Sequence, residues 1–314
     1  MLEELKKLGG IEVEENIPLK NLTTMRVGGN ARYFVVAHDM HELLSIAKAV
    51  LKLNLNFFIL AGGSNIIISD NGFDGVVIKN ESGDVSLEGN EAMVDSGIAL
   101  GVLIRKLAEL DLGGLEFLAG IPGTIGGALV SNAGAFGDNI SNHLKSVTIL
   151  DPMGEVRIVL KDDLKFGYRE SYFSKIKDFK ERGIILRARL ILRRGRREEI
   201  SRKINNYLRL RSSQPKGFSC GSFFKNPKIK IIEKDWETVV KDGRIPAGYL
   251  LEQVGAKGKN EGKICVSNDH ANWLINRGKG SAEEIKALAE SLKTEVDRRF
   301  GIKLEEEVNY IGLN

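Results

Sequence analysis

Residues 218–227, FSCGSFFKNP, place one hydroxyl among aromatic and small residues. Ser222 lies between Gly221 and Phe223, and a lysine and an asparagine follow before the proline. Clustered aromatic side chains usually form a core, in which a serine needs only a hydrogen-bond partner. The stretch alone therefore does not distinguish a core serine from a reactive one.

Two glycine-rich turns have the composition of a phosphate-binding site. Residues 62–65 read GGSN, and residues 123–127 read GTIGG. Without a Cβ in the way, backbone N–H groups can approach a phosphate closely, so the two turns together could hold a pyrophosphate from two sides. No GxGxxG pattern follows a strand within a βαβ unit and GxxxxGK[ST] does not occur, which disfavours Rossmann and P-loop sites. Tight turns without a ligand are the alternative for either loop alone.

The composition is that of a folded, multidomain protein. A chain of 314 residues exceeds one average domain, so two or three domains are expected. With 42% hydrophobic and 28% charged residues, the chain does not resemble a disordered one. The formal charge of +4 is too small to indicate a nucleic-acid partner. The basic run Arg193–Arg197 is interpreted as a solvated junction between a strand and a helix, with phosphate contact as the alternative.

Several classes of protein are disfavoured by what the sequence lacks. No apolar run approaches the roughly 20 residues that span a bilayer, and the N-terminus has no signal-peptide pattern. We therefore expect a cytoplasmic protein with no membrane partner. Cys220 and Cys265 have neither CxxC spacing nor nearby histidines, so buried free thiols are favoured over a disulfide. The four histidines are scattered, and no metal site is expected.

Helices alternate with short strands in the first part of the chain. Residues 39–54 predict an amphipathic helix with Asp39 as its N-cap and Glu42 three residues later. Residues 56–60 predict a buried strand that leads directly into the first glycine turn. Further strands are expected at residues 66–69, 76–80, 85–89 and 91–97, and a second amphipathic helix at residues 100–110.

The rest of the chain begins with the glycine-rich region 118–137. A hairpin that turns at residues 151–154 and a strand at residues 183–195 follow, and a charged helix at residues 197–211 marks a candidate domain boundary. The last third predicts a smaller α+β unit, which ends in a helix that Ser281 and Glu284 could cap as a box.

Seven motifs resemble, in order, those of the UDP-N-acetylenolpyruvoylglucosamine reductase (MurB) family. They are NLTTMRVGGNARYFV, LAGGSNIIISDNGFDGVVI, LAGIPGTIGGALVSNAGAFG, FGYRES, SCGSFFKNP, HANWLINRG and LEEEVNYIG. The similarity extends from about Asn16 to Gly312, and seven ordered motifs are far more specific than one glycine loop. The resemblance implies an α+β fold of three domains. Two of them form an FAD-binding unit of the vanillyl-alcohol-oxidase (VAO)/PCMH type, and a smaller one binds substrate.

The resemblance also implies a division of the chain. We expect the first lobe of the FAD-binding domain at residues 1–80 plus 304–314 and the second lobe at residues 81–196, with the PCMH-type unit at about 27–192. Residues 197–303 would form the substrate-binding domain. Only 53 residues separate Arg169 from Ser222, without a tyrosine-bearing lid insertion, which resembles the shorter, type II form.

By this resemblance the chain is an NADPH-dependent UDP-N-acetylmuramate dehydrogenase. It would reduce the enolpyruvyl ether of UDP-N-acetylglucosamine enolpyruvate to UDP-N-acetylmuramate, a cytoplasmic precursor of peptidoglycan. The enzyme would thereby contribute to cell wall biogenesis, on which cell shape and cell division depend. FAD would bind non-covalently, with its pyrophosphate on the two glycine turns. The residues expected near the cofactor are Arg26, Gly62, Gly63, Ser64, Asn65, Ile121, Pro122, Gly123, Thr124, Gly126, Gly127, Asn132 and Gly134.

Such a reduction makes specific demands on side chains. Hydride from flavin N5 adds to the terminal CH2 of the enolpyruvyl group, so negative charge develops at the neighbouring carbon and spreads into its carboxylate. Arg169 suits that carboxylate because a guanidinium binds it as a bidentate fork. Glu307 resembles the family's active-site glutamate, with Glu305 as the alternative because strand alternation puts both on one face. Ser222 matches the catalytic serine and would protonate that carbon, while the phenylalanines exclude stray water.

Other positions match or depart from the family pattern. Phe136 stands where many relatives have tyrosine, and Cys220 stands where a small alanine is common. His270 is expected to be structural or to support another residue. The residues expected at the substrate, where the lysines and the asparagine could bind the UDP diphosphate, are Tyr168, Lys216, Lys225 and Asn226.

Two other functions are alternatives. An oxidase of the same FAD fold would need an oxygen-accessible flavin, and the combination of Arg169, Ser222 and Glu307 disfavours it. A non-catalytic FAD- or nucleotide-binding module would leave the serine and the acids purely structural. We expect a monomer whose partners are a UDP-linked amino sugar and NADPH, with no nucleic acid.

Overall fold

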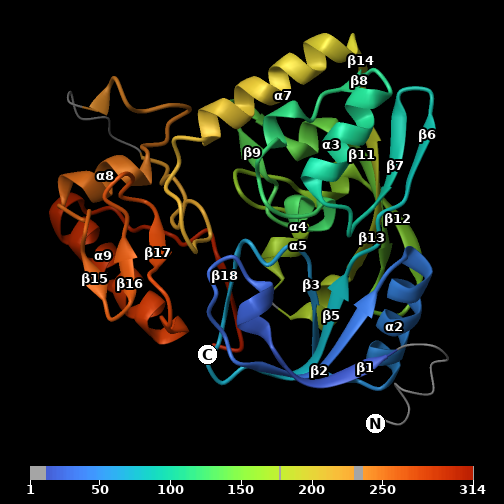
Figure 1. The fold of residues 1–314 in the computed structure, drawn as a ribbon, viewed down its shortest axis with the longest axis horizontal. Coiled ribbons are helices and arrows are strands. Elements are labelled where there is room, and N and C mark those ends of the chain that lie inside the picture. The colour runs from blue at the N-terminus through green and yellow to red at the C-terminus, as the bar shows by residue number, and fades with distance from the viewer. Residues whose placement is uncertain (1–11, 177, 230–235, 314) are drawn as a thin grey trace. The chain divides into compact units, whose positions relative to one another are not determined.

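A computed structural model describes residues 12–176, 178–229 and 236–313 (Figure 1). These residues form two compact units. Unit 1 comprises the described chain up to Ile17 together with Ala31–Gly62 and Asp74–Ser213, and unit 2 comprises Pro18–Asn30, Gly63–Phe73 and the described chain from Gln214 onwards. No helix within the described residues combines the length and apolar character needed to cross a membrane.

The first sheet of unit 1 packs against one helix. Its strands lie in the order β1 (Val13–Pro18), β2 (Asn30–Ala37), β5 (Phe73–Asn80) and β3 (Phe57–Leu60). Helix α2 (Met40–Lys52) buries an apolar face, including Leu43, Ile46 and Val50, in the core of this sheet. Asp39 caps α2 by accepting the N–H groups of His41 and Glu42, as predicted. Strand β5 starts earlier than expected because the turn before it is tighter, with Gly72 in the left-handed region at φ 81°.

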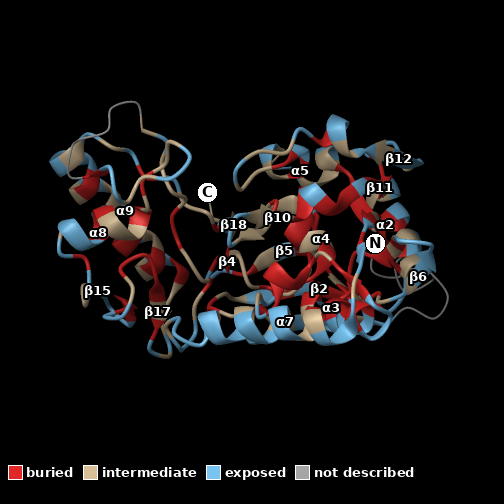
Figure 2. Ribbon diagram, turned by 90° about the horizontal axis from the view of Figure 1, so that it is seen from above, coloured by how far each residue is buried: buried red, intermediate tan, exposed pale blue. Residues whose placement is uncertain are grey.

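The second sheet of unit 1 is antiparallel and has five strands. Their order is β12 (Val156–Leu160), β11 (Leu144–Leu150), β13 (Ile184–Ile191), β7 (Glu91–Asp95) and β6 (Val85–Glu88). The hairpin predicted at residues 151–154 joins β11 to β12. One face carries a core to which α3 (Leu100–Glu109), α4 (Ile125–Val130) and the inner side of α7 (Arg197–Arg211) contribute. The buried residues of both cores are red in Figure 2.

Short elements complete unit 1. The four arginines of the basic run Arg193–Arg197 are exposed, so this run is the solvated junction that was predicted. Helix α7 packs with α3 and belongs to unit 1, whereas the substrate-binding domain was expected to begin at residue 197. The division into three domains stays a prediction. The short elements are β8 (Leu112–Gly113), η2 (Glu116–Leu118), β9 (Gly134–Ala135), β10 (Asp138–Asn139), η3 (Ile140–His143), η4 (Lys161–Leu164), α5 (Tyr172–Lys175), α6 (Phe179–Arg182) and β14 (Arg193–Arg194).

Unit 2 is built around its longest helix, α9 (Ala282–Phe300). Ser281 and Glu284 form the predicted capping box. Asp70, which the sequence did not mark, also accepts the N–H of Ala282 at 2.9 and 3.0 Å. The apolar face of α9 shares a core with Phe223 and Phe224. The other elements are η1 (Leu19–Leu22), β4 (Ile66–Ile68) paired in parallel with β18 (Asn309–Ile311), α8 (Ala247–Gln253), β15 (Asn260–Glu261), β16 (Ile264–Val266) and β17 (Leu274–Asn276).

Candidate active site

The two glycine turns meet within unit 1. Strand β3 ends at Leu60, and Gly62 lies directly against Gly123, so that a Cβ added to Gly62 would be 2.6 Å from the Gly123 Cα. Such a distance excludes any side chain at Gly62. Two stretches of main chain therefore face each other with no side chain between them, which is the geometry that a diphosphate needs for close N–H donation.

The second turn is fixed by the N-cap of helix α4 and by Ser96, which directly follows strand β7. The Thr124 hydroxyl accepts the N–H of Gly127 and so caps helix α4. The N–H of Gly126 donates to the Ser96 carbonyl at 2.7 Å, and a Cβ at Gly126 would be 3.0 Å from that oxygen. Thr124 and Gly126 thus have structural roles in addition to the cofactor contacts predicted for them.

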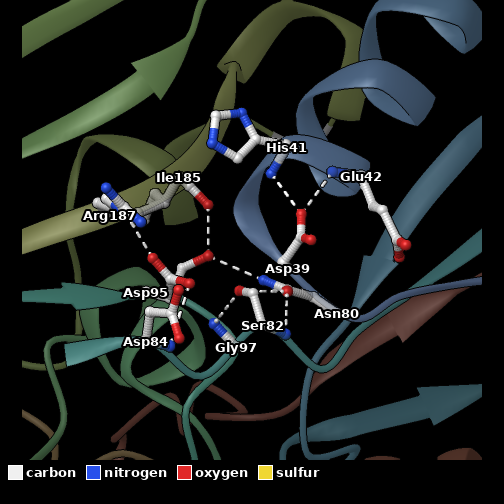
Figure 3. A network of polar contacts seen from close by, with 11 residues as sticks. Asp39, His41, Glu42, Asn80, Ser82, Asp84, Asp95, Gly97, Ile185 and Arg187 are labelled. Carbon is white, nitrogen blue, oxygen red and sulfur yellow. Dashed lines mark hydrogen bonds and ion pairs between the residues drawn. The ribbon is translucent and has the colours of Figure 1, made fainter.

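A buried polar network behind this turn joins the two sheets of unit 1 (Figure 3). The side-chain amide of Asn80, at the end of β5, donates to the Ser96 hydroxyl at 2.8 Å. Ser96 in turn donates to the Ile185 carbonyl at 2.6 Å on β13. The neighbouring carboxylate of Asp95 pairs with Arg187 at 2.6 Å. Because the side chains of Asn80 and Ser96 are both hydrogen-bonded, the network holds the strand end that positions Gly126.

Lys79 is a half-buried cation beside the first turn, and it was not predicted from the sequence. It lies opposite Leu60 in the parallel β3–β5 pair, and its Nζ donates to the Ala61 carbonyl at 2.6 Å. Burial lowers the pKa of Lys79. The only sequence signal was a lysine inside an otherwise apolar strand, VVIKN.

Arg169 occupies a strained turn that other residues anchor. The turn is closed by the Gly167 N–H, which donates to the Glu170 carbonyl at 2.9 Å, and Arg169 has φ 55°, a region that favours glycine. The Asn132 amide donates to the Gly167 carbonyl at 2.8 Å, and the Ser171 hydroxyl donates to the Val130 carbonyl at 2.7 Å. A non-glycine residue held in this conformation is typical of functional sites, where the side chain is needed.

Glycine also makes room for the guanidinium of Arg169. A Cβ at Gly134 would be 3.4 Å from Arg169 Nη1. Asn132 therefore contacts the Arg169 turn, and Gly134 lies beside the Arg169 guanidinium. The cofactor contacts expected for these two residues stay predictions. Tyr168 is exposed, and its ring centroid lies 5.8 Å from the Arg169 guanidinium.

A second guanidinium accompanies Arg169. Arg211, in the last turn of α7, donates to the carbonyls of Ala119 at 2.8 Å and Phe117 at 3.1 Å. Burial, and then the charge of Arg169, lower the pKa of Arg211. Its guanidinium also lies 5.1 Å from the ring centroid of Phe136. Two neighbouring cations favour an anionic ligand. From the sequence, Arg211 was expected only as the end of a charged helix.

The second half of the first turn belongs to unit 2. Gly63 has φ 61°, and a Cβ there would be 2.1 Å from the Leu22 carbonyl oxygen, so only glycine fits. The side-chain amide of Asn65 donates to the Glu307 carbonyl at 3.1 Å, and the Asn309 N–H donates to the Asn65 carbonyl at 3.0 Å. Asn65, which is predicted to bind the cofactor, is thereby linked to Glu307, which is predicted to be catalytic.

Ser222 lies on an extended segment of unit 2, between the segment that contains Trp273 and the segment that contains Glu307. It forms a β-bridge with Trp273, and the next residue, Phe223, accepts the N–H of Glu307 at 2.7 Å. Both Phe223 and Phe224 are 1% exposed, whereas Ser222 is half-buried. Among the described residues, the Ser222 hydroxyl has no hydrogen-bond partner. A core serine satisfied by a carbonyl, the alternative that the sequence allowed, is therefore not what the structure shows.

The Ser222 segment is held by the buried amide of Asn272. Its Oδ1 accepts the Phe224 N–H at 2.8 Å and its Nδ2 donates to the Phe224 carbonyl at 2.8 Å. His270 supports this arrangement because its Nδ1 accepts the N–H of Asn272 at 3.1 Å. Burial lowers the pKa of His270.

The three consecutive acids have different surroundings. The Glu305 side chain is 76% exposed and lies 3.5 Å from the Lys225 Nζ. The Glu306 side chain is 16% exposed and lies 3.7 Å from the Lys293 Nζ. Glu307 is half-buried, and its main chain pairs directly with the Ser222 segment. The Glu305 carbonyl also accepts the Lys225 N–H at 2.8 Å, so main-chain pairing does not distinguish the two acids. The high exposure of the Glu305 side chain favours the half-buried Glu307 instead.

The remaining predicted residues of unit 2 are exposed or support the main chain. Arg26 is exposed, has φ 58° and donates to the Asn21 carbonyl at 2.9 Å. The Asn226 Oδ1 accepts the Ala247 N–H at 3.0 Å and thus fixes the start of α8. Lys216 is exposed.

Cys220 and Cys265 are free and buried. Burial raises the pKa of the Cys220 thiol to about 12. The thiol is therefore protonated at neutral pH, and its described role is packing, with a contact of 3.7 Å to the Ile66 carbonyl. Among the described residues, no group of three or more histidine, cysteine, aspartate or glutamate side chains could hold a metal ion.

Comparisons with known proteins identify the two kinds of domain in the chain. Residues 31–159 match a family described as an FAD binding domain, and residues 214–311 match the C-terminal domain of UDP-N-acetylenolpyruvoylglucosamine reductase. The chain is therefore an FAD-dependent oxidoreductase, and the predicted α+β fold with an FAD-binding unit of the VAO/PCMH type is confirmed.

Full-length relatives identify the family. The UDP-N-acetylenolpyruvoylglucosamine reductase of Solibacter usitatus is 36% identical over 98% of this chain and 99% of its own length. That of Caldicellulosiruptor saccharolyticus is 36% identical over 98% of this chain and 94% of its own length. The crystal structure of MurB from Thermus caldophilus superposes with a TM-score of 0.76 at 29% identity, over 96% of this chain and 98% of that one. The chain belongs to the UDP-N-acetylenolpyruvoylglucosamine reductase family, and it uses NADPH.

Proposed function

We propose that this chain reduces the enolpyruvyl ether of UDP-N-acetylglucosamine enolpyruvate to UDP-N-acetylmuramate in the cytoplasm, through Ser222, Glu307 and Arg169. Family membership supports the overall reaction. The observation that supports these residues most is the hydrogen bond from the Glu307 N–H to the Phe223 carbonyl, which fixes the serine segment beside the glutamate segment.

Main-chain groups of the two glycine turns would hold the cofactor. Gly62 and Gly123 bring two stretches of main chain together without side chains, so that N–H groups of both turns could reach a pyrophosphate, and Gly63 and Asn65 continue the first turn toward Glu307. When bound, FAD supplies the hydride that the terminal CH2 of the ether receives. The other residues proposed for this task are Arg26, Ser64, Ile121, Pro122, Thr124, Gly126, Gly127, Asn132 and Gly134.

Arg169 would bind the substrate carboxylate, on which negative charge accumulates. A guanidinium gives two parallel hydrogen bonds and remains charged, so it stabilises this carboxylate more in the transition state than in the ground state. The turn around Arg169 is fixed by Asn132 and Ser171, so little reorganisation is needed. Arg211 adds a second positive charge to the same region.

Ser222 would donate the proton. Its Oγ–H bond breaks as a C–H bond forms at the carbon next to the carboxylate, and the serine then regains a proton from its surroundings. The half-buried hydroxyl has no competing partner among the described residues, so it is available to the substrate. The buried rings of Phe223 and Phe224 keep the Ser222 segment rigid and limit the access of water to it. Glu307 would orient the intermediate carboxylate.

Cations around the Ser222 segment would bind the substrate diphosphate. Lys225 pairs with Glu305, whose carboxylate is mostly exposed, so solvent weakens this pair and a diphosphate can compete for the lysine. Lys216, Asn226 and Tyr168 are the further residues proposed for substrate binding.

Purified protein tests this function directly. We expect a yellow chromophore that heat releases, because FAD is bound non-covalently. We also expect NADPH to be oxidised only when the enolpyruvyl sugar is present. Colourless protein that takes up no FAD would contradict both enzyme functions. NADPH oxidation that is independent of the sugar would instead indicate an oxidase.

A further inference from the structure

Strand β12 (Val156–Leu160) is an exposed, apolar edge of the five-stranded sheet of unit 1. Within the described residues it pairs with β11 alone, and the order of strands places it at the edge of the sheet. The exposed fractions are 48% for Val156, 71% for Ile158 and 58% for Leu160. Figure 2 shows this strand in the colour of exposed residues. Such an edge is a template for pairing with another chain, and proteins usually protect it with charges, proline or a covering element.

The register of the β11–β12 pair determines which main-chain groups of β12 point away from β11. At the hairpin, the Asp151 N–H donates to the Glu155 carbonyl at 2.9 Å. In an antiparallel ladder, hydrogen-bonded pairs alternate with pairs whose N–H and C=O groups point away. The alternation that starts at Asp151 and Glu155 therefore directs the main-chain groups of Val156, Ile158 and Leu160 away from β11.

The sequence of this edge, EVRIVLK at residues 155–161, complements itself when two copies run antiparallel. With a two-fold axis at Ile158, that side chain faces the partner's Ile158. Val156 then faces the partner's Leu160, so apolar side chains pair across the whole outward face. In this register, the main-chain N–H and C=O groups that point away from β11 face the same groups of the second copy. Up to six main-chain hydrogen bonds can form, two for each of the three hydrogen-bonded pairs.

Charge complementarity selects the same register. One step beyond the apolar pairs, Glu155 faces the partner's Lys161, and the symmetry repeats this pair at the other end. Glu155 is exposed and Lys161 is half-buried. A shift of the register by two residues would lose both opposite-charge pairs, and cross-strand pairs of this kind stabilise sheets.

We propose that β12 is a self-association edge, at which a second copy of this chain pairs antiparallel to form a weak two-fold dimer. One edge-to-edge strand pair buries much less surface than the roughly 1,600 Å² of a standard stable interface. We therefore expect a dissociation constant on the order of 100 µM, so the expected monomer prevails in dilute solution. The proposal concerns only unit 1 and does not depend on the reaction.

Sedimentation velocity on the full-length holoenzyme tests this proposal. The wild-type chain should show a mass that rises toward that of a dimer between about 1 µM and 500 µM. Glu155→Lys and Lys161→Glu should each weaken association at least about 10-fold, because each places two like-charge pairs in a symmetric dimer. The double variant Glu155→Lys/Lys161→Glu should associate as the wild type does. An equimolar mixture of the two single variants should form a heterodimer.

Two variants locate the interface. Ile158→Lys places two ammonium groups at the two-fold axis and should leave a monomer at every concentration. Leu87→Lys, on the opposite edge strand β6, is the matched control and should associate normally. A wild-type chain that stays monomeric throughout would overturn the proposal. Association that Ile158→Lys does not weaken would overturn it as well, and failure of the charge swap to restore association would refute the register.

Discussion

The residues proposed for function are held by different means in the two units. In unit 1 the main chain of one glycine turn lies directly against the other, at Gly62 and Gly123. In unit 2 the Ser222 segment is held by side-chain amides, chiefly that of Asn272. A close main-chain contact tolerates no added atom, whereas an amide clamp fails only when its hydrogen bonds are removed. The two units should therefore respond to different kinds of substitution.

Among the substitutions that compare the two units, the largest effect is expected from Arg169→Lys in unit 1. A point charge cannot replace the guanidinium fork, so kcat/KM should fall about 10²- to 10³-fold. Because the glycine turns are unaffected, the amount of FAD retained on purification should not change. Steady-state kinetics and flavin absorbance measure the two quantities. The control is Arg157→Lys, whose side chain is 62% exposed on β12, and near-normal turnover of Arg169→Lys would contradict the assignment.

In unit 2 the corresponding test is Asn272→Ala. It removes both hydrogen bonds to Phe224 and leaves a buried N–H and C=O unsatisfied, so the free energy of unfolding should fall by about 2–4 kcal/mol. Urea denaturation measures this loss. The matched control is Asn206→Ala on the exposed face of α7, which should change stability by less than about 0.5 kcal/mol. Equal effects of the two variants would refute the amide clamp.

Gly62→Ala and Gly101→Ala should change stability in opposite directions. The added methyl at Gly62 would overlap the Gly123 Cα, which should cost about 1–3 kcal/mol and weaken FAD binding. Gly101 lies in α3, where the nearest atom to an added Cβ is 3.8 Å away, so alanine should stabilise the helix by about 0.5–1 kcal/mol. Thermal unfolding of the apoproteins compares the two. Stabilisation by both substitutions would show that the turns are not in close contact.

The smallest effect is expected from Lys79→Gln. Glutamine can still donate to the Ala61 carbonyl but carries no charge, so FAD affinity should fall about 3- to 10-fold through the lost attraction to its pyrophosphate. Riboflavin, which has no phosphate, should bind both proteins equally. Fluorescence titration measures both ligands, with Lys52→Gln on the exposed end of α2 as the control. Equal losses for FAD and riboflavin would assign Lys79 a packing role only.

Features that depend on local residue type could be predicted from the sequence. Glycines at the two turns, the boundaries of α7 and the capping box of α9 were all predictable, because glycine, charge pattern and capping residues act locally. Family membership was also predictable, since seven ordered motifs resemble one family. The position of Gly62 against Gly123 was not, because it depends on how strands far apart in sequence are arranged.

Other parts of the site were hidden for a related reason. Asn272, Asp70 and Lys79 are ordinary residues in the sequence, and their importance comes from partners that only tertiary folding supplies. Arg211 was equally hidden in a charged helix, although it lies beside Arg169. Sequence motifs therefore locate the residues proposed for chemistry better than they locate the residues that hold them in place.

Ser222→Ala tests the proton-donor role most directly. Stopped-flow absorbance can separate reduction of the flavin by NADPH from its reoxidation by the enolpyruvyl substrate. The proposed role predicts an unchanged reduction rate and a reoxidation rate that is about 10²- to 10⁴-fold slower, because only the second step needs the serine proton. Reoxidation at the wild-type rate would contradict it.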